Sequence, residues 1–155
     1  MTVDEHCKFL GKLMANFQSL EFFLRAFLQE LPSARPIGIS YGTDIYSFPV
    51  GTELPESEFT SYDSLGLLIQ KFNGEMQKQG LSIVDATLVE VRDALAHGRV
   101  SSGTADGDLR LLKFARPKSG RVRVTFNQRM DEAWFKTEIG RVQEAVRVVY
   151  KAISQ

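Results

Sequence analysis

One row of apolar side chains near the N-terminus constrains the fold more than any other feature of this chain. The row repeats at steps of three and four residues and consists of Leu10, Leu13, Phe17, Leu20, Leu24, Phe27 and Leu31. This spacing places all seven side chains on one face of a long helix, as in a helical bundle. Pro32 ends the helix, because proline lacks the N–H that the next turn needs.

Three further segments carry helix signals. "TSYD" from Thr60 and "SIVD" from Ser82 fit the capping box, and they predict a second helix to about Gln79 and a third that begins at Ser82. The third helix is expected to bury Val84, Leu88, Val91 and Leu95. A fourth helix is expected from about Met130, with its apolar stripe at Phe135, Ile139, Val142, Val146, Val149 and Ile153.

Two segments interrupt the helical pattern. Prolines and glycines recur through residues 33–59, which predicts a long loop. Its aromatic residues Tyr41, Tyr46 and Phe48 are expected to pin the loop onto the core rather than to stack on bases. Residues 109–126 predict a β-hairpin, in which Val122, Val124 and Phe126 share one face. We therefore expect one all-α domain over residues 1–155, an antiparallel bundle of about four to five helices with a β-hairpin inserted before the last helix.

Composition narrows the class of protein. The chain has no apolar run long enough to span a membrane, and acidic residues stand near its N-terminus where a signal peptide carries positive charge. Its one cysteine, Cys7, fits a reducing compartment, so a cytoplasmic location is expected. Neither a cysteine pair nor a histidine cluster suggests a metal site, and we expect no metal and no cofactor.

The net charge of zero hides an uneven distribution. Residues 1–91 carry 12 acidic and 6 basic side chains, whereas residues 92–129 carry 9 basic and 3 acidic ones. A basic segment of this kind favours a polyanionic partner, with Arg99, Arg121 and Arg123 as candidate contacts. The alternative is a basic hairpin that is merely solvated.

The stretch "EVRDALAHGRV" places an arginine, an acid and a histidine in the last two turns of the third helix, just before Gly98. Gly98 stands where a left-handed C-terminal cap belongs. Asp93 and His97 are four residues apart, so the carboxylate can orient the imidazole. Arg92 is about 140° around the helix from His97, so one chain does not readily bring both to one phosphate. The alternative is a histidine that caps the helix and an Arg92–Asp93 surface pair.

The segment Arg92-Asp93-Ala94-Leu95-Ala96-His97-Gly98 resembles the signature of the HEPN superfamily, an arginine and a polar residue followed by a histidine near the end of a bundle helix. The resemblance covers most of the first three expected helices and implies metal-independent endoribonuclease activity. It further implies a homodimer, in which Arg92 and His97 from two copies form one site, and RNA products with a 2′,3′-cyclic phosphate. A toxin or phage-defence setting, with an antitoxin or regulatory protein as a further partner, would fit such an enzyme.

Two residues qualify the resemblance. Glu21 lies beside the apolar row of the first helix and matches the acid that the family carries there. The resemblance therefore implies that its carboxylate supports Arg92 or His97. The alternative is that Glu21 is an exposed residue at the edge of the apolar row. Arg99 stands where toxins silenced by a nucleotidyltransferase have a tyrosine, which argues against control by modification at that position. The rival functions are a non-catalytic dimeric scaffold and a small-ligand sensor that uses loop 33–59.

Overall fold

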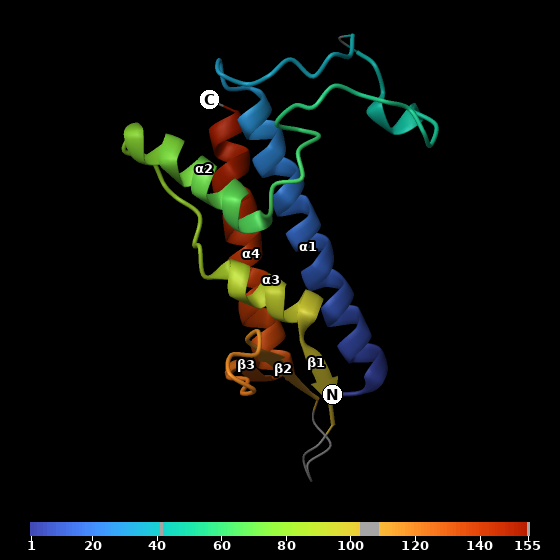
Figure 1. Cartoon of the computed structure of the whole chain (residues 1–155), viewed down its shortest axis with the longest axis vertical. Coiled ribbons are helices and arrows are strands. Elements are labelled where there is room, and N and C mark those ends of the chain that lie inside the picture. The colour runs from blue at the N-terminus through green and yellow to red at the C-terminus, as the bar shows by residue number, and fades with distance from the viewer. Residues whose placement is uncertain (41, 103–108, 155) are drawn as a thin grey trace. The chain divides into compact units, whose positions relative to one another are not determined.

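The computed structural model describes residues 1–40, 42–102 and 109–154. Its main elements are α1 (Val3–Gln29), α2 (Leu65–Lys78), α3 (Leu88–His97), β1 (Arg99–Ser101), β2 (Arg110–Phe114), β3 (Val124–Arg129) and α4 (Glu132–Ile153) (Figure 1). They form two compact units, the first built from residues 1–20 and 85–147 and the second from residues 21–84 and 148–155. Both α1 and α4 contribute to each unit. The single domain expected over residues 1–155 stays a prediction.

The first helix agrees with the sequence pattern. α1 ends at Gln29, three residues before Pro32, and it buries Leu13, Phe17, Leu20 and Leu24. Its N-terminus is fixed by a capping box, in which the Glu5 backbone N–H donates to Thr2 Oγ1 at 3.2 Å and the Thr2 backbone N–H donates to the Glu5 carboxylate at 2.8 Å. The described part of the chain contains no helix with the length and apolarity of a membrane span.

The second helix begins later than expected. Ser64, not Thr60, caps α2, because the Ser64 hydroxyl accepts a hydrogen bond from the Leu67 backbone N–H at 3.3 Å. The Thr60 hydroxyl instead donates a hydrogen bond to the carbonyl of Pro55, earlier in the chain, at 3.0 Å. Arg25 of α1 donates to the backbone carbonyls of Ser61 and Asp63 at 2.7 and 2.9 Å, which holds the segment before α2 in a non-helical form.

The third helix is also shorter than expected. It begins at Leu88, not at Ser82, because residues 81–87 are irregular. Val84 is buried as expected, but both of its backbone groups bind the Asn73 side chain at 2.8 Å, which competes with helix formation. Leu95 is half-buried, and Ala94 is the buried residue of that turn.

The chain is mostly helical, but it is a mixed α/β protein and not the all-α protein expected. A three-stranded antiparallel sheet has the order β1-β2-β3. β2 and β3 form the predicted hairpin, but β3 begins at Val124, so that Val122 lies before the strand, and it extends to Arg129. β1 was missed, because three residues are too few to show a strand pattern; it forms by pairing Arg99–Ser101 with β2.

The last helix confirms the expected apolar stripe in most positions. α4 buries Phe135, Ile139, Val142 and Val149, whereas Val146 and Ile153 are half-buried. Within the first unit Phe135 is the centre of an aromatic group: His6 and Trp134 meet its ring edge-on at centroid distances of 5.3 and 4.9 Å, and Phe9 stacks on it at 5.7 Å.

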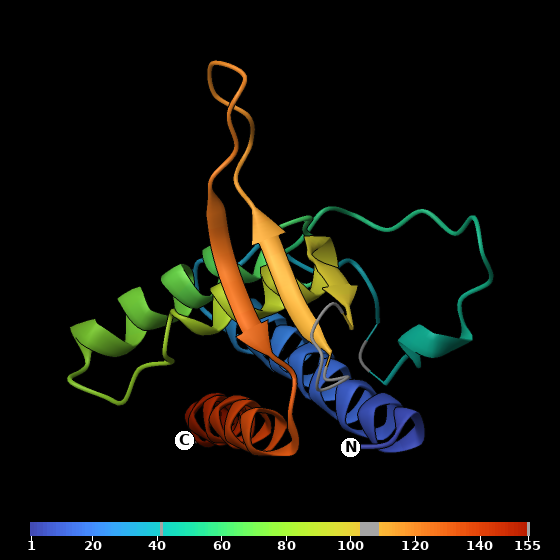
Figure 2. The same ribbon diagram turned by 90° about the horizontal axis from the view of Figure 1, so that it is seen from below.

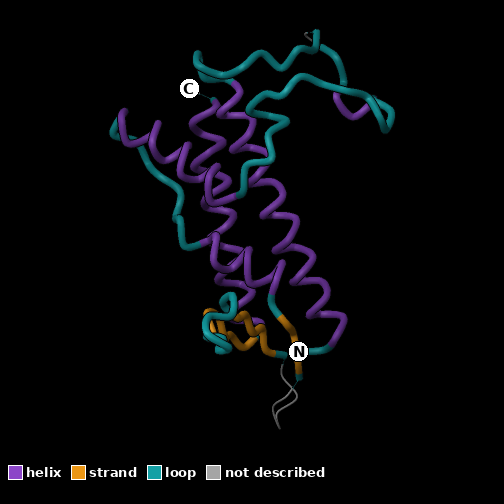
Figure 3. Tube along the Cα trace, in the orientation of Figure 1, coloured by secondary structure: helices purple, strands orange, loops and turns teal. Residues whose placement is uncertain are grey.

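The long connection from α1 to α2 follows the expected loop 33–59, and among its described residues only Ile45–Ser47 form a short 3-10 helix (Figure 3). The expectation that its aromatic residues pin it to the core is wrong for Tyr46, which is 80% exposed because the loop does not fold back there. Phe48 is half-buried, and Tyr41 lies outside the described residues.

Gly98 is required for a reason other than the left-handed cap expected. Its φ is −77° and its ψ is 176°, an extended conformation that any residue adopts. A Cβ at this position would overlap the Ala94 carbonyl oxygen and would lie 2.6 Å from Leu111 Cδ1 of β2. The glycine therefore allows the end of α3 to approach the sheet closely.

We expect Gly98→Ala to destabilise the chain by about 1–3 kcal/mol, because the added methyl group must displace backbone or Leu111. Gly140→Ala is the matched control. Gly140 lies inside α4 and has no neighbour within 4 Å of the place that an added methyl group would take, so alanine there should stabilise the helix by about 0.5–1 kcal/mol. Urea unfolding curves measure both changes, and equal effects of the two substitutions would contradict the close approach.

Candidate functional site

The candidate site lies at the end of α3, in the first unit. The start of this helix is anchored by Asp85, whose carboxylate accepts hydrogen bonds from the Thr87 backbone N–H at 2.9 Å and from Arg141 of α4 at 2.7 Å. The Arg141 hydrogen bond holds the pKa of Asp85 below its usual value. Arg141 also donates to Thr87 and, at 2.7 Å, to the buried carboxylate of Glu138. This network fixes the first turn of α3 to α4.

The other end of α3 is fixed to the sheet. The Gly98 backbone N–H donates to the Ala94 carbonyl at 2.7 Å, and the chain then continues directly into β1. Leu88, Val91 and Ala94 are the buried face of the helix. Arg92, Asp93 and His97 are thus carried on a helix that is held at both ends, and they lie outside its buried face.

Asp93 pairs with basic groups on two elements. Its carboxylate oxygens lie 3.9 Å from Arg92 Nη1 and 3.5 Å from Lys113 Nζ of β2. The side chains of Asp93 and Lys113 are 42% and 25% exposed, so each contact contributes less than about 1 kcal/mol. Sequence analysis did not single out Lys113; its only signal was a base within the predicted hairpin.

His97 does not receive the partner that the sequence suggested. It is exposed as the last residue of α3, and no described residue forms a hydrogen bond or ion pair with its imidazole. Asp93, expected to orient His97, faces Lys113 instead. Arg92 is 34% exposed. Because α3 is helical from Leu88 to His97, the separation of Arg92 and His97 by about 140° holds in the folded chain.

The remaining predicted residues lie elsewhere. Arg99 of β1 is exposed, and its guanidinium carbon lies 5.2 Å from the ring centroid of Phe114 on the neighbouring strand β2. Arg121 and Arg123 are exposed in the turn region of the hairpin. Glu21 is half-buried on α1 in the second unit, so its expected role beside Arg92 and His97 stays a prediction.

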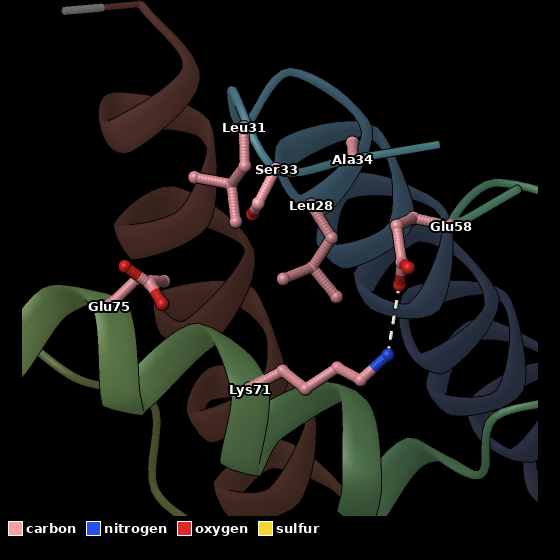
Figure 4. A pocket seen from close by; sticks show the side chains of 7 residues that line it. All are labelled: Leu28, Leu31, Ser33, Ala34, Glu58, Lys71 and Glu75. Carbon is pink, nitrogen blue, oxygen red and sulfur yellow. Dashed lines mark hydrogen bonds and ion pairs between the residues drawn. The ribbon is translucent and has the colours of Figure 1, made fainter. Parts of the chain in front are cut away.

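A cavity of about 190 Å³ in the second unit brings together the two ends of the long loop (Figure 4). Leu28 and Leu31 supply apolar walls, and Ser33 and Glu58 come from the loop. Lys71 Nζ is 2.9 Å from the Glu58 carboxylate and 2.8 Å from the Asp63 carboxylate. The hydrogen bond from Lys71 lowers the pKa of Asp63. These charges satisfy one another, and their evident role is to hold Glu58 and Asp63 to α2.

The described residues contain no group of three or more side chains suited to a metal ion. Comparison of the chain with protein-family models, curated proteins and solved structures finds no match. The chemistry of the end of α3 is therefore judged from its own residues: an exposed imidazole at the last helical position and, separately, an acid paired with a guanidinium and an ammonium group.

The two histidines of the chain have opposite environments, which gives a test. His6 is 7% exposed, its Nδ1 has no hydrogen-bond partner among the described residues, and burial lowers its pKa. The unfolded chain therefore binds this proton at a higher pH than the folded chain. The stability contributed by neutral His6 is complete above about pH 6.5 and is lost as the pH falls below that value.

We expect the free energy of unfolding to decrease between pH 7 and pH 5.5 in the wild type and in His97→Gln, and to decrease less in His6→Gln. Urea unfolding at several pH values measures the slope for each protein. A slope that is equal in His6→Gln and the wild type would contradict a buried, neutral His6. His97→Gln is the control, because it removes the exposed imidazole and leaves the aromatic group around Phe135 intact.

Proposed function

We propose that this chain is a metal-independent endoribonuclease of HEPN type, active as a homodimer in which Arg92 of one copy and His97 of the other form each site. The observation that carries the proposal is the placement of both side chains outside the buried face of α3, with His97 exposed at the helix end. Residues that serve only packing would be buried, and a helix held at both ends gives a site the rigidity that catalysis needs.

The chemistry follows from the two side chains. A neutral imidazole takes the proton of the ribose 2′-hydroxyl, the 2′-oxygen attacks the adjacent phosphorus, and the bond from phosphorus to the 5′-oxygen breaks. The imidazolium formed in this way gives that proton to the leaving 5′-oxygen. The products are a 2′,3′-cyclic phosphate and a 5′-hydroxyl. Arginine, always charged and able to contact two phosphate oxygens, stabilises the charge that builds up at phosphorus.

The position of Asp93 supports a role different from the one expected. Because its carboxylate lies near Lys113 of β2, Asp93 connects the last turns of α3 to the sheet and keeps a second cation close to Arg92. In this proposal Asp93 positions the helix, and His97 is oriented by the dimer or by the RNA. The bundle arrangement, the cytoplasmic location and the toxin or defence setting, with an antitoxin or regulator as partner, belong to the same proposal.

One observation favours a second candidate function. A catalytic imidazole is usually held by a neighbouring group, and His97 has no such partner among the described residues. This favours a non-catalytic module of the same type, a dimeric scaffold that binds a partner protein. The two candidates differ in one property, the cleavage of RNA.

We expect Arg92→Ala and His97→Ala each to reduce RNA cleavage by about 10²–10⁴, because each removes either the proton-transfer group or the stabilising cation. Arg147→Ala is the matched control, since Arg147 is an exposed arginine of α4 paired with Glu144 at 2.9 Å. Cleavage should continue in EDTA and should leave a cyclic phosphate at the new 3′ end. If both variants remain folded by circular dichroism and cut RNA like the wild type, the scaffold function replaces the nuclease.

The composite site makes a second, independent prediction. Arg92→Ala retains His97 and His97→Ala retains Arg92, so a dimer that contains one copy of each has one complete site. An equal mixture of the two variants, after subunit exchange, should recover about a quarter of wild-type activity, because half of the dimers are mixed and each has one intact site of two. Sedimentation measures the dimer directly. A mixture as inactive as its components would contradict a site shared between copies.

A further inference from the structure

The tip of the β2–β3 hairpin forms a separate feature, residues 115–123, which we call the basic arm. Figure 2 shows it extending past the ends of both strands. The Ala115 backbone N–H donates to the Arg123 carbonyl at 2.8 Å, and two hydrogen bonds at 2.8 and 3.1 Å join Lys118 and Arg121 around the turn. Ser119 and Gly120 occupy the turn with φ values of 51° and 73°. The arm is thus an ordered ribbon.

The basic arm has no core face. Every residue from Arg116 to Arg123 is exposed, including Val122 at 53%, and Val124, the first residue of β3, is 49% exposed although the two valines alternate with polar residues. In a sheet that packs on a core, this alternation buries the apolar positions. Among the described residues no core covers the apolar side chains of the arm, which leaves them available to a partner.

The charges of the basic arm lack acidic neighbours. Arg116, Lys118, Arg121 and Arg123 lie within nine residues that contain no acid, and none of these four side chains forms an ion pair with a described residue. Other exposed bases do have partners: Lys136 lies 2.6 Å from Glu132, and Arg147 lies 2.9 Å from Glu144. Four unneutralised cations close together repel one another unless an anion joins them.

The same four cations surround a hollow of about 400 Å³, whose other lining residues are Ala115 and Val122. A hollow accepts a narrow, flexible chain of charges better than it accepts a flat anionic surface. Arginine side chains can each contact two oxygens of one phosphate, and a valine methyl group can contact a ribose or a base. The shape, the charge and the apolar component together match a phosphodiester backbone.

We propose that the basic arm binds the phosphodiester backbone of single-stranded RNA, apart from the end of α3; the choice of RNA rests on the proposed function. Four contacts between cations and phosphates displace about four counterions from the RNA. For a single strand, the logarithm of the association constant then falls with the logarithm of the salt concentration with a slope of about −3. Removing two of the cations should bring the slope closer to zero by about 1.4. The sequence of the RNA should matter little, because phosphates carry no sequence information.

The test measures binding without cleavage. A fluorescent RNA oligomer with 2′-O-methyl groups has no free 2′-hydroxyl and is not cut by the chemistry proposed above. Anisotropy titrations between about 50 and 200 mM salt give the slope for each protein. We compare the wild type with Arg121→Gln/Arg123→Gln and with the control Lys136→Gln/Arg147→Gln, which removes the same charge from α4. Only the variant of the arm should lose affinity and show the shallower slope.

Each outcome decides a different statement. Equal slopes for the arm variant and the wild type, or equal losses in the two variants, overturn the role of the arm whatever the cleavage assays show. Displacement of the oligomer by polyglutamate at equal charge concentration overturns it too, because an acidic protein is then the better partner. If the arm-dependent slope is found but ordinary RNA stays uncut by the wild type, the binding site stands and the nuclease function fails.

Discussion

The close approach of Gly98 to β2 is the constraint on which the described arrangement of the first unit depends. A methyl group at this position would overlap the Ala94 carbonyl oxygen and would lie 3.2 Å from the Leu112 carbonyl oxygen of β2, so the absent side chain lets the helix end approach the sheet closely. From that point the chain enters β1, which pairs with β2 in antiparallel register, Arg99 opposite Leu112. The end of α3, the start of the sheet and the position of His97 thus all lie within two residues of this close approach.

The opposite end of α3 depends on a charge network rather than on close packing. Arg141 contacts Asp85, Thr87 and Glu138, and Glu138 is 7% exposed. A carboxylate buried to this extent is destabilising unless it is paired, so loss of Arg141 would leave Glu138 uncompensated. One network therefore holds the start of α3, and its end lies in close contact with the sheet. Arg92 and Asp93 stand on the helix between these two points.

The periodic parts of the fold could be predicted from the sequence, and the parts that depend on distant contacts could not. The apolar rows of α1 and α4 are long enough to define a helix by themselves. The start of α3 was misplaced because Asn73 binds both backbone groups of Val84, an interaction between residues 11 apart that no local pattern records. β1 was missed because it becomes a strand only by pairing with β2. For the site, the position of Arg92 and His97 on the exposed part of α3 was predictable, but the pairing of Asp93 with Lys113 was not.

β2 links the two features that the proposals use. On one side it contacts the end of α3 through Leu111 and Lys113, and through its other end it continues into the basic arm. The residues of the arm from Arg116 to Arg123 are exposed, whereas Leu111 of β2 is 1% exposed. RNA bound at the arm would therefore contact a hairpin whose strand β2 also contacts the end of α3. In the proposal, RNA contacts both the arm and the end of α3, two parts of the chain that β2 connects, so that binding at the first raises the local concentration of RNA near the second.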